Sequence, residues 1–446
     1  MPATTAALAE WHAAGASPAG GNGLVRLSDA LSAAGAHRDS LERLALTMIA
    51  NGAEIFAGDR DGRSPLAHAV ASGSVGLVQA LLDRGVDPNS SDRQGRSPLF
   101  DALALPAERA LTMTRALLRA GADPELTSAS GETPLGLALA HPEPELRKVL
   151  NWPQWKLPRR GVRAEDLSAA AAVGDTDAVE KLLGLGISIN AVDNQGATAL
   201  LRACGCGHAT LVARLLELGA DPEQKAPSGA TPLSAAVTAR RDAVVATLLK
   251  CGMPVDQRLP AGGTALMIAA ALGFPEIVGL LLEHGAQTNA QDERGTNALH
   301  AVGQFAFRSA ETARAQRIIE LLLKHGADVN ATNAAGQTPL LLLLGARAEP
   351  GTSADQKHLL VLLRQLLGAG ADVDVQDQRG VGPLHACGMH GLLLPARVLL
   401  AARADTSRRD VLDRSAREVA HLLGYIDVAA EIGSREAHSF PLRNVE

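Results

Sequence analysis

The sequence predicts an all-α solenoid, a stack of about twelve helix–turn–helix units over residues 27–432. One phrase, Gly-x-(Thr/Ser)-Pro-Leu, recurs along the chain, and a second, Leu-Leu-x-x-Gly-(Ala/Val)-Asp, keeps a constant phase with it. Strict and loose copies of the first phrase begin at Gly62, Gly95, Gly131, Gly196, Gly229, Gly262, Gly295, Gly336 and Gly380. Many of these glycines are 33 residues apart. A fixed period of this length indicates a solenoid, in which each unit packs only on its neighbours.

Each copy of the first phrase carries the start signals of a helix. Its Thr or Ser stands where a side-chain oxygen caps a helix, and its Pro follows at the first helical position, where the missing N–H costs nothing. Glycines such as Gly73 and Gly207 are expected to end this first helix. A second helix carries Val-x-x-Leu-Leu, as at residues 78–82, and ends at a glycine such as Gly85. The Asp-rich and Asn-rich segment that follows has the composition of a tight turn.

Both phrases resemble the ankyrin repeat, whose period is about 33 residues and whose signature includes Thr-Pro-Leu-His. The resemblance covers nearly the whole chain and implies helix pairs joined by β-hairpin fingers. It also implies that the finger tips and the outward side of each first helix form a concave surface that binds proteins. His300 and His385 stand at the histidine position of the signature, where the family uses the imidazole to brace neighbouring units by hydrogen bonds.

Breaks in the repeat predict how the chain is divided. Residues 1–26 and 433–446 are expected to be tails outside the repeats. Residues 151–162 contain two tryptophans and two prolines, and the prolines end the helix of the fourth unit there. This interruption favours two stacks, at residues 27–150 and 163–432, joined by a junction. One continuous stack with a degenerate interface is the alternative.

The two largest insertions relative to the period come late in the chain. The step from Gly295 to Gly336 is 41 residues, and the step from Gly336 to Gly380 is 44. Both additions are expected to be loops inserted between the two helices of a unit, near residues 304–315 and 346–357. Loops often carry function, although padding that the fold tolerates is the commoner explanation.

Composition narrows the class of protein. The formal net charge of -6 argues against a nucleic-acid binder, which would show a basic face. Four cysteines in 446 residues form no disulfide framework and favour a reducing compartment, the cytoplasm. No secretory signal is found, and the longest apolar runs, at residues 339–344 and 359–363, are too short to insert in a membrane. The richness in Ala, Gly and Arg suggests a bacterial genome.

No catalytic residue, metal ligand or cofactor is predicted. Cys204 and Cys206 have no second pair of ligands to complete a zinc site, and they fit the end of a first helix. His385 and Cys387 would point to different sides of a helix. Phosphate-binding, nucleophile-elbow and zinc-protease motifs are not found. We therefore expect a protein that is not an enzyme.

The candidate binding residues lie just before and after the anchor glycines, where side chains are exposed and do not specify the stack. They are Arg60, Asp61, Arg63, Arg93, Gln94, Arg96, Glu293, Arg294, Gln378 and Arg379. The four arginines of the first two fingers could hold an acidic partner, or they could only keep this edge soluble. Trp152 and Trp155 are a second candidate, predicted either to fill the seam between stacks or to anchor a partner.

The leading hypothesis is a non-catalytic scaffold or adaptor that captures a partner protein on the concave surface, in a bacterial cytoplasm. The first alternative is an effector that a specialised secretion system delivers to a host cell, where it binds a host protein. A regulatory arm of an enzyme complex and a self-assembling structural protein are further alternatives. The sequence predicts neither the partner nor the oligomeric state.

Overall fold

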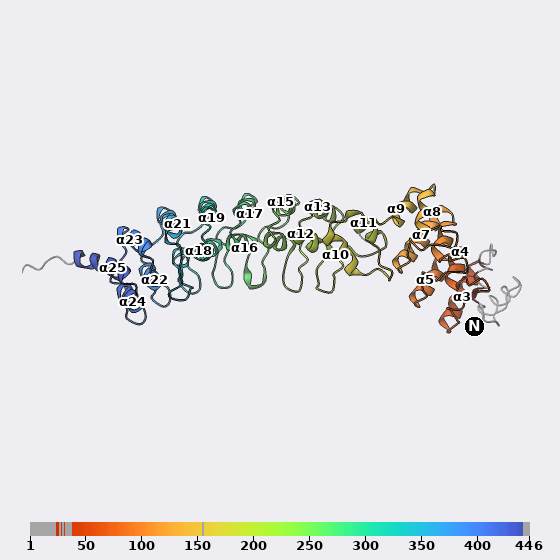
Figure 1. The fold of residues 1–446 in the computed structure, drawn as a ribbon, viewed down its shortest axis with the longest axis horizontal. Coiled ribbons are helices and arrows are strands. Elements are labelled where there is room, and N and C mark those ends of the chain that lie inside the picture. The colour runs from red at the N-terminus through yellow and green to blue at the C-terminus, as the bar shows by residue number, and fades with distance from the viewer. Residues whose placement is uncertain (1–23, 26–27, 29–30, 32–37, 154–155, 440–446) are drawn as a thin grey trace, which may run out of the picture. The chain divides into compact units, whose positions relative to one another are not determined.

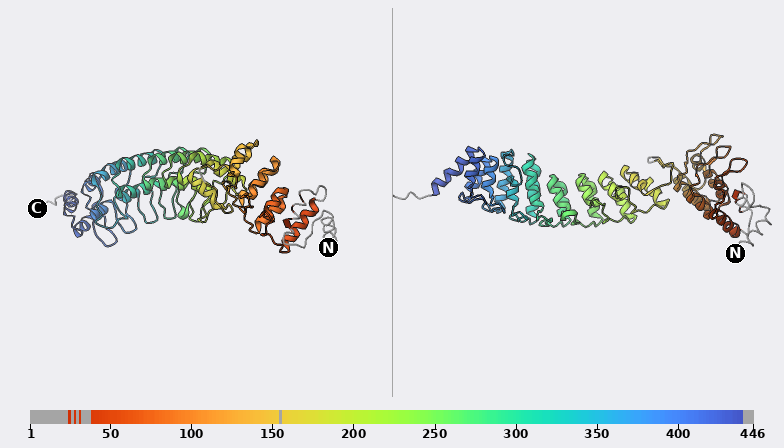
Figure 2. Two further views of the ribbon diagram at one scale, coloured as in Figure 1. Left: turned by 45° about the vertical axis from the view of Figure 1, so that its right-hand side comes forward. Right: turned by 90° about the horizontal axis from the view of Figure 1, so that it is seen from below.

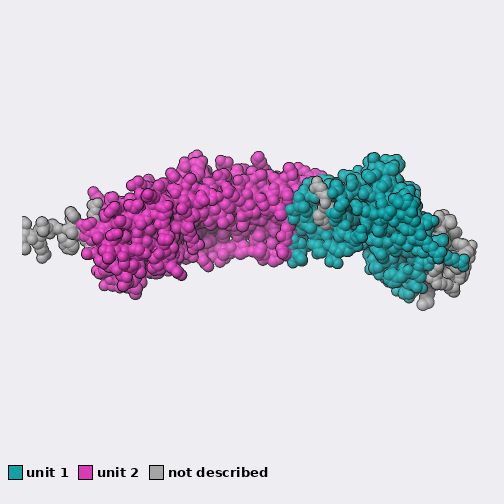
Figure 3. Space-filling model, in the orientation of Figure 1, with its two compact units in different colours: residues 1–194 teal, residues 195–446 magenta. Residues whose placement is uncertain are grey.

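The computed structural model describes residues 24–25, 28, 31, 38–153 and 156–439. Over these residues the chain is a succession of short helices, so the predicted all-α solenoid is confirmed. It divides into two compact units, Met1–Asn194 and Gln195–Glu446 (Figure 3). The predicted junction at residues 151–162 falls inside the first unit, and the separation of two stacks at that point stays a prediction for unfolding experiments.

The first unit contains α3 to α11. Their bounds are α3 Arg38–Ala50, α4 Pro65–Ser72, α5 Val75–Asp83, α6 Pro98–Leu103, α7 Ala107–Arg119, α8 Pro134–Ala140, α9 Pro144–Leu150, α10 Ala164–Val173 and α11 Thr176–Gly184. From α4 onward the helices form consecutive pairs, and the loop that leads from one pair to the next is called a finger here. The count of about twelve units stays a prediction, because the start of the chain lies outside the described residues.

The second unit continues the pairs from α12 to α25. Their bounds are α12 Ala199–Cys206, α13 Ala209–Glu217, α14 Pro232–Thr238, α15 Asp242–Lys250, η2 Pro260–Gly262, α16 Ala265–Leu272, α17 Pro275–Glu283, α18 Ala298–Arg308, α19 Thr312–Lys324, α20 Pro339–Leu343, α21 Gln356–Gly368, α22 Pro383–His390, α23 Leu393–Ala401, α24 Ala416–Leu422 and α25 Ile426–Ser439. In this unit the second helices form one row, the first helices form another, and the fingers project beside the first helices (Figures 1 and 2).

The helix ends follow the predicted capping chemistry. Ser64 caps α4 by accepting a hydrogen bond from the backbone N–H of Ala67 at 3.2 Å, and Pro65 occupies the first helical position. Gly73 ends the helix with a φ of 68°, in the left-handed region that glycine adopts without strain. Thr338 caps α20 in the same way as Ser64 caps α4. The repeated phrase is therefore a repeated helix start.

The core is a succession of thin apolar layers between neighbouring pairs. First helices pack on first helices, as α16 does on α18, and second helices pack on second helices, as α17 does on α19. Leu299, Ile318, Leu340 and Leu362 are almost fully buried between these layers. Burial of each such side chain contributes roughly 1.5–3 kcal/mol. Each layer is thin because it lies only between neighbouring pairs, so Leu, Ile, Val and Ala fill it and few aromatic side chains are needed.

The fingers are tight turns held together by backbone hydrogen bonds. In the first described finger the N–H of Asp59 donates to the carbonyl of Arg63 at 2.9 Å, and the N–H of Gly62 donates to the carbonyl of Asp59 at 3.0 Å. Successive fingers are also joined, as by the bond of 2.9 Å from the Arg93 N–H to the Asp61 carbonyl. The described fingers contain no strand, although isolated bridge residues occur at 192 and 198 and at 409 and 415, the last two as an antiparallel pair. The tight turns expected from the composition of these segments are therefore present. The β-hairpins that the family resemblance implies stay a prediction.

The two inserted segments differ from each other. Of the loop expected near residues 304–315, only residues 309–311 lie between helices, because α18 continues to Arg308 and α19 begins at Thr312. The addition lengthens both helices, since Ala306 and Phe307 keep the apolar side of α18 buried. The second addition is a loop between α20 and α21, spanning residues 344–355.

The end of the chain also departs from expectation. α25 extends to Ser439, so the segment after residue 432 begins as helix and not as a tail. Buried Val428, Ala429 and Ile432 hold this helix against the last repeat. Among the described residues, every helix is too short or too polar to cross a membrane.

Candidate functional site

The fingers of the first unit hold six of the candidate residues. Arg60, Asp61, Arg93 and Gln94 are exposed at the tips, and Arg63 and Arg96 are half-buried. The Arg63 guanidinium forms an ion pair of 2.7 Å with Asp101 on α6. Burial raises the pKa of Asp101, and the charge of Arg63 opposes this rise. Arg63 therefore compensates a half-buried carboxylate inside the stack.

Arg96 is likewise used within the fold. Its guanidinium carbon lies 5.0 Å from the centre of the Phe100 ring, in cation–π geometry. The guanidinium groups of Arg60 and Arg93 make no ion pair or hydrogen bond with the described residues. Of the four arginines predicted to face a partner, the structure thus leaves two fully at the surface.

The predicted tryptophan pair lies in the junction of the first unit. Trp152 is buried, with 5% of its surface exposed, and the Lys181 amine lies 5.3 Å from the centre of its ring. The same amine donates to the Asn151 carbonyl and pairs with Asp177. Trp152 therefore packs between the junction and α11 within this unit. Trp155 lies outside the described residues.

The four candidate residues of the second unit are exposed: Glu293, Arg294, Gln378 and Arg379. The Arg379 guanidinium donates to Asp377 at 2.9 Å and to the Ala346 carbonyl at 2.8 Å, which fixes its position. The Gln378 amide donates to the backbone of the preceding finger at 2.7 Å. The Arg294 side chain makes no ion pair or hydrogen bond with the described residues.

Three of these residues border one hollow of about 450 Å³, which we call the arginine hollow. It is lined by the fingers at residues 294–296, 333–337 and 378–379 and by residues 346–347 of the inserted loop. Its lining includes Arg294, Arg347 and Arg379 but no Asp or Glu. Arg347 is exposed, and its guanidinium also has no partner among the described residues. The hollow therefore presents positive charge that its own walls do not neutralise.

A second hollow of about 360 Å³, called the apolar hollow, adjoins the first, because Arg379 lines both. Its walls come from α22, α24 and the fingers that precede them. They include Val411, Leu412 and Leu422, which are 69%, 65% and 70% exposed. Pro350 of the inserted loop closes one side. Exposed apolar side chains gathered around a hollow are typical of a binding surface.

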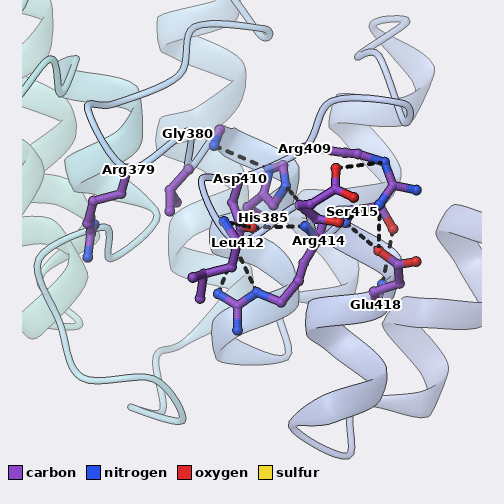
Figure 4. A network of polar contacts seen from close by, with 12 residues as sticks. Arg379, Gly380, His385, Arg409, Asp410, Leu412, Arg414, Ser415 and Glu418 are labelled. Atoms are coloured by element: carbon purple, nitrogen blue, oxygen red, sulfur yellow. Dashed lines mark hydrogen bonds and ion pairs between the residues drawn. The ribbon is translucent and has the colours of Figure 1, made fainter.

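The polar groups at the apolar hollow satisfy one another (Figure 4). Arg414 donates to Asp410 at 2.6 Å and 2.9 Å, and the backbone N–H of Leu412 donates to the same carboxylate. Burial acts to raise the pKa of Asp410, but these hydrogen bonds outweigh it and hold the pKa below its usual value. His385 donates to the Arg414 carbonyl at 3.1 Å. The hollow therefore suits an apolar group and needs no polar ligand.

Sequence reasoning missed Arg347, Val411 and Leu412. The last finger lacks the anchor glycine, because Asp413 takes its place with a φ of 58°. This finger has the same pair of backbone hydrogen bonds as the others, from the N–H of Asp410 and that of Asp413. The segment Asp410-x-x-Asp413 is thus the signal that would have placed Val411 and Leu412 at a finger tip. Arg347 belongs to an insertion that the repeat phase cannot position.

The histidines and cysteines that the sequence offers as possible metal ligands or bracing residues have structural roles in the fold. His300 donates to the Gln337 carbonyl of the next repeat at 2.9 Å, which is the bracing implied by the resemblance. Cys204 and Cys387 are buried, and burial raises the pKa of both thiols. Among the described residues, no three His, Cys, Asp or Glu side chains gather where they could hold a metal ion.

A family model described as ankyrin repeats (3 copies) matches residues 30–128, 167–258 and 251–333. These residues make up more than half of the chain. They include the Arg294 finger and end before the inserted loop that supplies Arg347. No curated protein sequence matches the chain.

Proposed function

The chain belongs to the ankyrin-repeat family, and on that premise we propose that it is a non-catalytic scaffold that captures a partner protein. Ankyrin repeats generally mediate protein–protein interaction and typically act as binding scaffolds. We propose that the partner docks on the finger face of the second unit, which we define as the fingers, the first helices and the inserted loop around the arginine and apolar hollows.

One observation carries this proposal: the finger face of the second unit offers groups that the fold itself does not use. Arg294 and Arg347 have no partner among the described residues, and Val411, Leu412 and Leu422 expose most of their surface beside them. Arginine is enriched at protein interfaces, and covering exposed apolar surface is a main driving force of protein association.

We place the protein in a cytoplasm, and the Ala-, Gly- and Arg-rich composition supports a bacterial source. Cys206 and Cys251 are exposed free thiols, a state that a reducing compartment maintains. Delivery to a host cell, a regulatory role in an enzyme complex and self-assembly gain no specific support from the described residues.

Affinity capture from the native cell, followed by quantitative mass spectrometry, tests the proposal. Three baits are compared with the unaltered chain: R294A/R347A, V411S/L412S and the matched control R60A/R93A. Val411 and Leu412 are 69% and 65% exposed, and the four arginines are exposed as well, so the variants should fold. We expect the first two baits to lose the same protein and the control to retain it. A captured set that none of the substitutions alters would contradict docking on this face.

A further inference from the structure

The arginine hollow has a charge that calls for an anionic ligand. Its lining carries three guanidinium groups and no carboxylate. Asp292, at the base of the same finger, is turned into the backbone, where it accepts from the N–H groups of Arg294 and Thr296. Only the Arg379 charge is matched locally, by Asp377. Guanidinium groups bind carboxylates with two parallel hydrogen bonds when the geometry allows.

The apolar hollow has the opposite preference. Its carboxylate, Asp410, is saturated by Arg414 and by backbone N–H groups. The side chains that remain available are those of Val411, Leu412 and Leu422. A ligand gains there by covering apolar surface, and a charged group would lose its hydration without compensation.

The inserted loop joins the two hollows into one surface. Residues 346–347 line the arginine hollow, and Pro350 of the same loop lines the apolar hollow. The loop is anchored on the following pair, because the N–H of Gly351 donates to the Met389 carbonyl at 2.9 Å. Arg379, which lines both hollows, is held by Asp377 and by the loop carbonyl of Ala346. A single short ligand can therefore contact both hollows at once.

We propose, on the basis of the proposed function, that this surface binds a linear segment of a protein that carries carboxylate side chains next to a large apolar side chain. The carboxylates face Arg294 and Arg347, and the apolar side chain enters the hollow between Leu412 and Leu422. A nucleic acid would supply anionic groups for the first hollow only. The apolar character of the second hollow favours the acidic–apolar peptide, because only a peptide brings an apolar side chain beside its carboxylates.

The test uses the full chain and a displayed library of random 16-residue peptides. We expect the enriched peptides to share two or more Asp or Glu residues within a few positions of Leu, Ile, Phe or Met. Each enriched peptide is then synthesised with a fluorescent label, and its Kd is measured by anisotropy. R294A/R347A and V411S/L412S should each weaken binding at least tenfold, whereas R60A/R93A should change it less than twofold. Thermal melts of all variants confirm that they are folded.

Several results would overturn the inference: no enrichment, enriched peptides without acidic residues, or binding that survives both variants of the second unit. Displacement of the peptide by a single-stranded oligonucleotide at equal charge concentration would assign the surface to nucleic acid instead. Peptides that lack acidic residues but still depend on Val411 and Leu412 would leave the scaffold function standing and refute only the partner chemistry. Native capture that depends on none of the substituted residues would refute the scaffold site itself.

Discussion

The arginines of the first two fingers and the arginines around the arginine hollow differ in how the fold uses them. Arg63 neutralises the half-buried Asp101, and Arg96 lies over the Phe100 ring, so both act inside the stack. Arg294 and Arg347 meet no carboxylate among the described residues and border a hollow. Arg63 and Arg96 follow their anchor glycines and reach Asp101 and Phe100 on α6. Arg294 precedes its anchor glycine and Arg347 lies in the inserted loop, where neither side chain has such a partner among the described residues.

The position of a residue in the repeat therefore predicts whether its side chain is exposed. It does not predict whether another residue of the chain already binds that side chain. A finger arginine becomes structural when the following helix presents an acidic or aromatic side chain within reach. The same reasoning applies to Trp152, which was a candidate anchor and is buried under Lys181. Substitution of a residue that stabilises the stack should lower stability, whereas substitution of a residue left for a partner should lower binding alone.

The largest effect is expected at Trp152. W152A should lower the free energy of unfolding by about 3–5 kcal/mol, because it removes a buried aromatic ring and leaves a cavity beside Lys181. Urea denaturation of the full chain measures the change, with W152F as a control that should lose less. A loss below about 1 kcal/mol would show that the ring is not part of the core.

The second effect contrasts two finger arginines. R63A should cost about 1–3 kcal/mol, because it leaves the Asp101 carboxylate partly buried without its ion pair. R294A should stay within about 0.5 kcal/mol of the unaltered chain, since Arg294 is exposed and its side chain has no described partner. Equal losses in the free energy of unfolding for R63A and R294A would contradict the division into a structural arginine and a free one. Adding D101N to R63A should recover part of the stability.

The smallest effect concerns pH near the apolar hollow. Burial lowers the pKa of His385, against the opposing hydrogen bond to the Arg414 carbonyl. The unfolded chain, with an ordinary pKa of 6.5, binds a proton before the folded chain does, so stability falls as the pH drops below about 6.5. H385Q removes this titration while keeping a hydrogen-bond donor. Its denaturation midpoint should fall less between pH 7.5 and pH 5.5 than that of the unaltered chain, and parallel decreases would refute the assignment.

Much of the fold follows from the sequence because the repeated phrase carries its own physics. The caps at Ser64 and Thr338 and the bracing histidine His300 lie where the residues and the family resemblance place them. The loop near residues 304–315 is shorter than expected because helical apolar periodicity continues through Phe307 without a proline to stop it.

The candidate site was only partly predictable. Arg294, Gln378 and Arg379 were nominated from the phase of the repeat, and the structure brings them together around one hollow. Arg347 could not be placed, since the path of an inserted loop depends on the contacts it makes with the next pair. The apolar tip of the last finger was hidden because Asp413 replaces the glycine that marks the others.

Hydrogen–deuterium exchange of the full chain, with and without its captured partner, tests the central claim most directly. The account predicts that the partner slows exchange at residues 293–297, 333–337, 377–381 and 410–414, which form the finger face of the second unit. Exchange at residues 59–63 and 92–96, the first two described fingers, should be unchanged. Protection confined to those first fingers, with none on the second unit, would contradict it.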